Sequence, residues 1–161
     1  MRVYVPLTVH GLTSLHHAGR IAPAPLAAHA VTPAMRAAMA DADEDELEYA
    51  AHMAAAYDSL VLIAGAGAEA RRVVVAADVD DAAVAIAGGD DVSLVQVASE
   101  IPLARCSAVH VDDADADGEV ALAVARLPEA QAGDGPALAA VSLVQLELMW
   151  FATQEIPDLL T

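Results

Sequence analysis

Three aspartates, Asp113, Asp115 and Asp117, precede Gly118 in a pattern that resembles the start of a calcium-binding loop. Such a loop places oxygen ligands at positions 1, 3 and 5, turns at a glycine and closes with a bidentate glutamate at position 12. Position 12 is Val124 here, so the closing carboxylate is missing. The three aspartates remain candidate metal ligands, but the pattern favours a strand-to-helix turn whose carboxylates accept from the first helical amides.

His110 and Asp112 lie two residues apart in a predicted strand, so both side chains should point to one face, which Cys106 would share. A histidine beside carboxylates at a strand end can hold a metal ion or act as a base with an orienting partner. With Asp113, this pair supports one hypothesis, a metal-dependent hydrolase or transferase. The alternative is a structural histidine that is hydrogen-bonded at the edge of a sheet. His29 and His52 are isolated in the sequence.

The rarest residue types gather near the C-terminus, where Trp150 and Phe151 follow Glu147. We expect Glu147 to lie in a nearly all-apolar helix, where a buried carboxylate would need a partner. Since the chain has few aromatic residues, each is expected to matter for packing or recognition. The candidate residues for binding a ligand or partner are Tyr49, His110, Asp112, Glu147, Trp150 and Glu155.

Several common chemistries are excluded by what the chain lacks. All seven basic residues are arginine, so neither a Schiff-base lysine nor a phosphate-loop lysine is present. A single cysteine rules out an internal disulfide and multi-cysteine zinc sites. The glycines at 65–70 fit a dinucleotide pattern, but a helix is expected before them rather than after them. We expect no cofactor, and the residues do not decide whether the protein is an enzyme.

The formal net charge of −17, from 24 acidic against 7 basic residues, disfavours binding to nucleic acid or an anionic membrane. A basic protein partner or a cation is electrostatically easier, and the charge also serves solubility. No leader or convincing membrane span is recognised, so a cytoplasmic protein is expected. A protein partner or a homodimer is possible.

The pattern of apolar residues predicts an α+β fold. Strands are expected at residues 2–8, 26–31, 71–79, 92–98 and 106–112, with a weaker one at 84–86. Helices are expected at residues 9–18, 34–40, 44–64, a segment ending near 127, and 137–154, with a break at 128–136. Segment 71–79 is apolar on both faces, which places it inside the sheet. We predict a single domain, residues 1–161, with a mixed sheet of about four to five strands packed against several helices.

Five segments, in their order along the chain, resemble an uncharacterised family of small acidic proteins from high-GC actinobacteria. They are residues 1–8, 30–36, 46–50, 109–115 and 146–160. The resemblance implies a single cytoplasmic domain and supplies no catalytic residues. Since no catalytic set is recognised and the charge is strong, the leading hypothesis is a non-enzymatic binding or regulatory module that holds a protein partner or small ligand on a sheet face or in a groove beside the C-terminal helix.

Overall fold

The computed structural model describes residues 1–142 and 147–161. Its main sheet contains β1 (Arg2–Leu7), β3 (Leu26–His29), β4 (Val73–Asp78), β5 (Val84–Ile86), β6 (Leu94–Val97), β8 (Cys106–Val111) and β9 (Met149–Phe151). Their spatial order is β5-β6-β3-β1-β4-β8-β9, and each pairing between these described strands is antiparallel. A second sheet pairs β2 (Arg20–Ile21) with β7 (Ile101–Pro102).

The α+β class is as predicted, but the expected mixed sheet of about four to five strands is wrong. Strands β3 and β4 are both antiparallel to β1, so they run in the same direction as each other. They do not touch, because β1 lies between them. The long helical connection thus produces no parallel neighbours. The sheet is also larger than expected, with seven strands.

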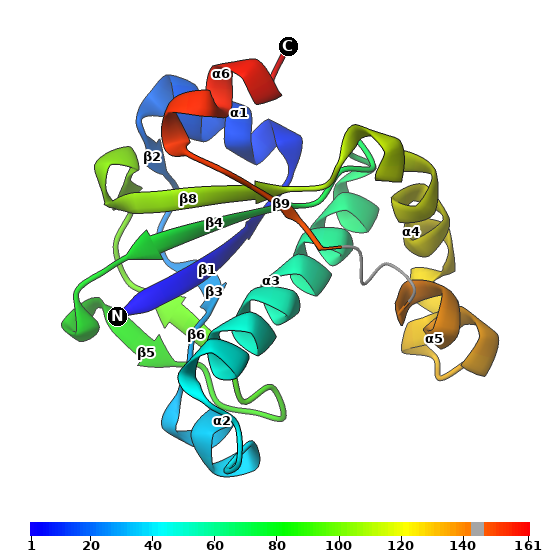
Figure 1. The fold of residues 1–161 in the computed structure, drawn as a ribbon, viewed down its shortest axis with the longest axis horizontal. Helices are drawn as coiled ribbons and strands as arrows, with labels where there is room; N and C mark the ends of the chain where they lie inside the picture. Colours follow the sequence, from blue (N-terminus) through cyan, green and yellow to red (C-terminus); the bar gives the residue numbers. More distant parts are fainter. Residues whose placement is uncertain (143–146) are drawn as a thin grey trace.

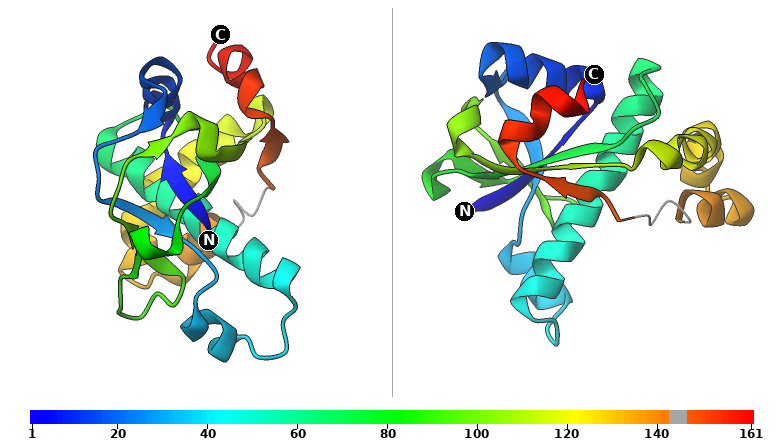
Figure 2. Two further views of the ribbon diagram at one scale, coloured as in Figure 1. Left: turned by 90° about the vertical axis from the view of Figure 1, so that its left-hand side faces the viewer. Right: turned by 45° about the horizontal axis from the view of Figure 1, so that its top comes forward.

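The helices are α1 (Val9–Ala18), α2 (Pro33–Ala38), α3 (Glu44–Ala66), α4 (Asp117–Gln131), α5 (Gly135–Ser142) and α6 (Ile156–Leu159). Helices α1 and α6 lie on one face of the sheet and α3 crosses the other, as Figures 1 and 2 show. Helices α4 and α5 form a separate pair beside the C-terminal half of α3 (Figure 1).

Alternation along the central strands sends side chains into two cores. Val3 of β1 and Val75 of β4 join the core under α1 and α6. Tyr4 and Val74 face the other way and pack with α3. Strand β4 is therefore buried on both faces between β1 and β8, which confirms its predicted interior position.

Local signals in the chain set the helix boundaries. Helix α1 spans the predicted residues, with the Thr8 hydroxyl accepting from the Gly11 amide and Gly19 ending the helix at φ 69°. Helix α3 begins with a reciprocal capping box between Asp43 and Glu46. It ends at Ala66, two residues beyond the predicted end at 64, and Gly67 caps it with a φ of 58°.

Two expectations about the C-terminal third are wrong. Helix α4 runs through Pro128 to Gln131, although Pro128 has no amide to donate to the Val124 carbonyl. The expected helix at 137–154 does not form as such: α5 ends at Ser142, residues 143–146 lie outside the described residues, and β9 follows. Strand β9 pairs with the edge of β8, an interaction that helical periodicity does not reveal.

Ser59 ties α3 to the sheet. Its fully buried hydroxyl donates to the Leu7 carbonyl at 2.6 Å and accepts from the Val73 amide at 3.0 Å. One side chain thereby joins α3 to the end of β1 and the start of β4.

Replacing Ser59 with alanine should lower the free energy of unfolding by about 1–3 kcal/mol, because two buried backbone groups lose a partner. Urea denaturation measures this loss. The control is Ser14→Ala on α1, where an exposed hydroxyl donates to the His10 carbonyl and little change is expected. Equally small losses for Ser59→Ala and Ser14→Ala would contradict a stabilising role of the Ser59 hydrogen bonds.

Candidate functional site

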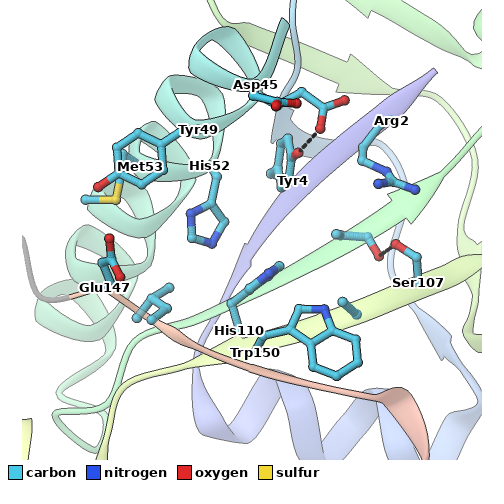
Figure 3. A pocket seen from close by; sticks show the side chains of 14 residues that line it. Arg2, Tyr4, Asp45, Tyr49, His52, Met53, Ser107, His110, Glu147 and Trp150 are labelled. Carbon is cyan, nitrogen blue, oxygen red and sulfur yellow. Dashed lines mark hydrogen bonds between the residues drawn. The ribbon is translucent and has the colours of Figure 1, made fainter.

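A cavity of about 600 Å³ lies between the N-terminal half of α3 and the sheet (Figure 3). We call it the α3 pocket. It is lined by Arg2, Tyr4, Asp45, Glu48, Tyr49, His52, Met53, Ala76, Ser107, Ala108, His110, Glu147, Leu148 and Trp150. Several of these side chains are polar or aromatic, in a chain whose apolar residues are mostly aliphatic.

Helical and strand geometry together bring these residues to one place. Asp45, Tyr49 and His52 recur at spacings of three and four, so they share one face of α3. His110 of β8 stands opposite Trp150 of β9 in the antiparallel register, so both side chains project from the same face of the sheet.

The floor of the pocket is made of small residues. Ala76 of β4 pairs with Tyr4 of β1 on one side and with Ala108 of β8 on the other. Both alanines line the cavity, and both are buried. Their single methyl groups leave the space that a leucine or valine would fill.

Two imidazoles meet inside the pocket. The rings of His52 and His110 lie 4.4 Å apart between centroids at 65°, and Tyr4 stands edge-on to His52 at 5.6 Å. Nε2 of His52 and Nδ1 of His110 are buried and have no hydrogen-bond partner among the described residues. Buried polar atoms are almost always paired, so these two nitrogens mark a place where a ligand can donate or accept.

The environment keeps the two histidines and Tyr4 of the pocket neutral. Burial lowers the pKa of His52 to about 4, and the neighbouring His110 and Arg72 act in the same direction. Burial also lowers the pKa of His110, although a backbone hydrogen bond with Val74 opposes it. Burial, followed by the charge of Glu48, raises the pKa of Tyr4 to about 12. At neutral pH the pocket therefore offers two uncharged imidazoles and a phenol.

The charges at the pocket are mostly negative. Glu48 accepts a hydrogen bond from the Tyr4 hydroxyl at 3.2 Å, and Asp45 and Glu147 also line the cavity. Among the described lining residues, Arg2 is the only arginine. Its guanidinium donates to both carboxylate oxygens of Asp78, at 3.2 and 3.1 Å, which compensates its charge.

Four of the six candidate binding residues meet at the α3 pocket: Tyr49, His110, Glu147 and Trp150. Trp150 is 62% exposed and Tyr49 51% exposed, so an open groove adjoins the aromatic residues. Glu147 does not lie in a helix but just before β9. Whether these four residues bind a ligand stays a prediction.

Asp112 and Glu155 do not line the pocket. The Asp112 carboxylate is 1% exposed and accepts from Arg72 through Nη2 at 2.6 Å, Nε at 2.9 Å and the backbone amide at 2.7 Å. Glu155 accepts from the Ala152 amide at 2.7 Å and so stabilises the turn before α6. Both carboxylates therefore have structural partners.

The metal-dependent enzyme hypothesis is not favoured by this arrangement. His110 faces the pocket, Asp112 is held by Arg72, and Asp113 accepts from the Asp115 amide at 3.2 Å. Within residues 1–142 and 147–161, no group of three or more His, Cys, Asp or Glu side chains is placed to hold a metal ion.

The acidic loop adopts the favoured strand-to-helix turn. The Asp113 carboxylate accepts from the Asp115 amide, and Asp117 accepts from the Gly118 amide at 2.7 Å, at the start of α4.

The expectation that Cys106 shares the face of His110 is wrong. A register shift in the β4–β8 pairing interrupts the alternation, and Cys106 packs in the core under α1 and α6 with Val109 and Val111.

Sequence reasoning missed Arg2, Tyr4, Glu48 and His52 as pocket residues. The helical spacing from Tyr49 could have suggested His52, but only strand pairing brings β1 and β8 beneath α3.

His29 is isolated in the sequence but not in the fold. It is fully buried and contacts Asp58 at 3.0 Å and Ser93 at 2.8 Å, which links β3 to α3 and to the segment before β6.

Fold and site together define an α+β protein with a polar, aromatic-edged pocket beneath its longest described helix. The chain belongs to a family of unknown function, DUF6912, whose match covers residues 1–160. This finding confirms the resemblance to an uncharacterised family. Comparison with curated proteins and with solved structures gave no match. Among the described helices, none has the length and apolarity needed to span a membrane.

Replacing Asp112 with asparagine should cost about 3 kcal/mol of stability, because the buried Arg72 charge loses its counter-charge. Urea denaturation tests this value. Glu44→Gln is the control, since its ion pair with Arg36 is exposed and should contribute little to stability. A loss for Asp112→Asn no larger than that of the control would contradict a structural role for the pair.

Stability should fall as the pH decreases from about 6.5 to 4. The pKa of His52 is about 4 in the folded chain, against 6.5 for an unperturbed histidine, so the unfolded chain binds the proton first. The size of this effect is roughly 2 kcal/mol after allowance for the solvent contact of the ring. Urea denaturation at several pH values should show a flatter dependence for His52→Gln.

The matched control is His10→Gln, which removes an exposed imidazole. It should leave the pH dependence as in the wild type. If His52→Gln also leaves it unchanged, the neutral state of His52 is refuted.

Proposed function

We propose that this protein is a binding module and that its ligand site is the α3 pocket. The observation that carries the proposal is the pair of imidazoles, on His52 and His110, that line the cavity and that each have one buried nitrogen without a partner among the described residues. A cavity of about 600 Å³ has the volume typical of small-molecule sites. Convergent polar groups inside a partly apolar wall are the second feature of such sites.

The exposed aromatic residues support the same proposal. The chain has one tryptophan, and it lies 62% exposed on the edge strand β9 beside the cavity. Tyr49, 51% exposed, lies on α3 at the same pocket. Such side chains bury large area on a ligand with little loss of conformational entropy.

Binding is preferred over catalysis because no activated nucleophile accompanies the imidazoles in the described lining. Ser107 donates to the Ala76 carbonyl at 3.1 Å rather than to a histidine. Burial raises the pKa of Cys106 to about 11, and this thiol lies in the opposite core.

A protein partner or a second copy of the chain is the other candidate occupant of this region. Strand β9 lies at the edge of the sheet, where Met149 is 46% exposed beside Trp150. An exposed edge strand can pair with another chain. The cytoplasmic location, the actinobacterial relatives, and the expected absence of a cofactor and of nucleic-acid binding stay predictions.

Ala108→Leu should abolish ligand binding, because the added side chain fills the floor of the pocket. Intrinsic fluorescence of Trp150 reports on this site alone, since it is the only tryptophan. A panel of amines, carboxylates, nucleosides and sugars is titrated into the wild type. Any compound that shifts the emission should lose at least about tenfold in affinity with Ala108→Leu, or 1.4 kcal/mol.

Ala104→Leu serves as the control, because Ala104 is exposed and does not line the pocket. Thermal melts verify that both variants are folded. Equal affinity of the wild type and Ala108→Leu, or no shift with any compound, would reject the pocket as a ligand site. Sedimentation at several concentrations separately tests self-association.

A further inference from the structure

We infer that the α3 pocket binds an organic cation, that is, a protonated amine or a guanidinium group carried on a larger body. This inference rests on the proposed function and specifies the ligand class for the same site. Three independent features of the lining lead to it: its carboxylates, its unpaired imidazole nitrogens and its aromatic residues.

Carboxylates line the pocket from two directions. Asp45 and Glu48 come from the first turns of α3, and Glu147 comes from the segment before β9 (Figure 3). The single guanidinium in the lining, Arg2, is paired with Asp78. A ligand anion would therefore be repelled, and a cation attracted, by the groups nearest to it. The net charge of −17 adds a long-range field of the same sign.

The imidazoles suit a donor that carries several N–H groups. A neutral histidine has one nitrogen that accepts, and both rings are kept neutral by burial. Ammonium and guanidinium groups offer three and five N–H donors, respectively. The ring centroids lie 4.4 Å apart, so a single such group bound against this pair would contact both His52 and His110.

Aromatic and apolar side chains complete a site for the body of the ligand. Trp150 and Tyr49 present large π-systems at the opening, and cations bind favourably over such faces. Met53 and Leu148 supply apolar wall. The volume of about 600 Å³ is far larger than a metal ion needs, which favours an organic cation.

The same chemistry occurs in free amines and in the lysine or arginine side chains of a basic protein. The probes distinguish these sources. Tyramine and agmatine represent free cations, and the capped peptides acetyl-Gly-Lys-Gly-amide and acetyl-Gly-Arg-Gly-amide represent protein side chains. Tyrosol and 3-(4-hydroxyphenyl)propionate are the neutral and anionic counterparts of tyramine.

Titration of these probes against Trp150 fluorescence at pH 7 and low salt tests the inference. Tyramine or agmatine should bind at least tenfold more tightly than tyrosol, and the anionic analogue should give no saturable change. Binding of the cation should weaken at least tenfold in Glu48→Gln and remain unchanged in Glu119→Gln. Glu119 is exposed on α4 and carries the same charge outside the pocket.

In Glu48→Gln the side-chain amide oxygen can still accept from the Tyr4 hydroxyl, and Asp45→Asn provides a second variant if Glu48→Gln fails to fold. Peptides that bind as tightly as the free amines would identify the cation as a protein side chain. If the neutral or anionic analogue binds more tightly and its binding is lost in Ala108→Leu, the inference of an organic cation is wrong. The proposal that the α3 pocket is a ligand site would then still hold. No response to any probe or to the wider panel would overturn both.

Discussion

Helix α3 lies across the sheet under two different constraints along its length. Near its C-terminal half, the Ser59 hydroxyl joins the Leu7 carbonyl to the Val73 amide and holds the helix close to β1 and β4. Toward its N-terminal half, the strands present the small side chains of Ala76 and Ala108, so the same rigid helix cannot close the space beneath it. The α3 pocket is thus a consequence of a helix docked firmly at one end over a floor of alanines.

The buried groups around this helix have contrasting electrostatic roles. Arg72 and Asp112 are charged, buried and paired, and their mutual attraction offsets the cost of removing both from water. His52 and His110 are neutral, and each has one buried nitrogen without a partner among the described residues. The first arrangement is complete within the described protein, whereas the second would be completed by the ligand that we propose. That difference separates a structural pair from a candidate site in the same sheet.

Much of the local structure was predictable because its signals are short-range. The Thr8 cap and Gly19 define α1, and the apolar residues on both faces of β4 place it inside the sheet. The C-terminal segment was misjudged because its apolar residues fit a helix as well as a strand. Only the pairing of Met149 and Phe151 with β8 decides between them, and that pairing depends on a distant segment.

By itself, the amino-acid sequence determined the α+β class, most helix boundaries, the strongly acidic surface and four residues of the pocket. Tertiary structure alone decided that His52, Tyr4 and Glu48 join His110, and that Asp112 belongs to a buried ion pair instead. The physical reason is the range of the forces involved. Caps and periodicity act within a few residues, whereas strand register and helix docking bring together groups that are tens of residues apart in the chain.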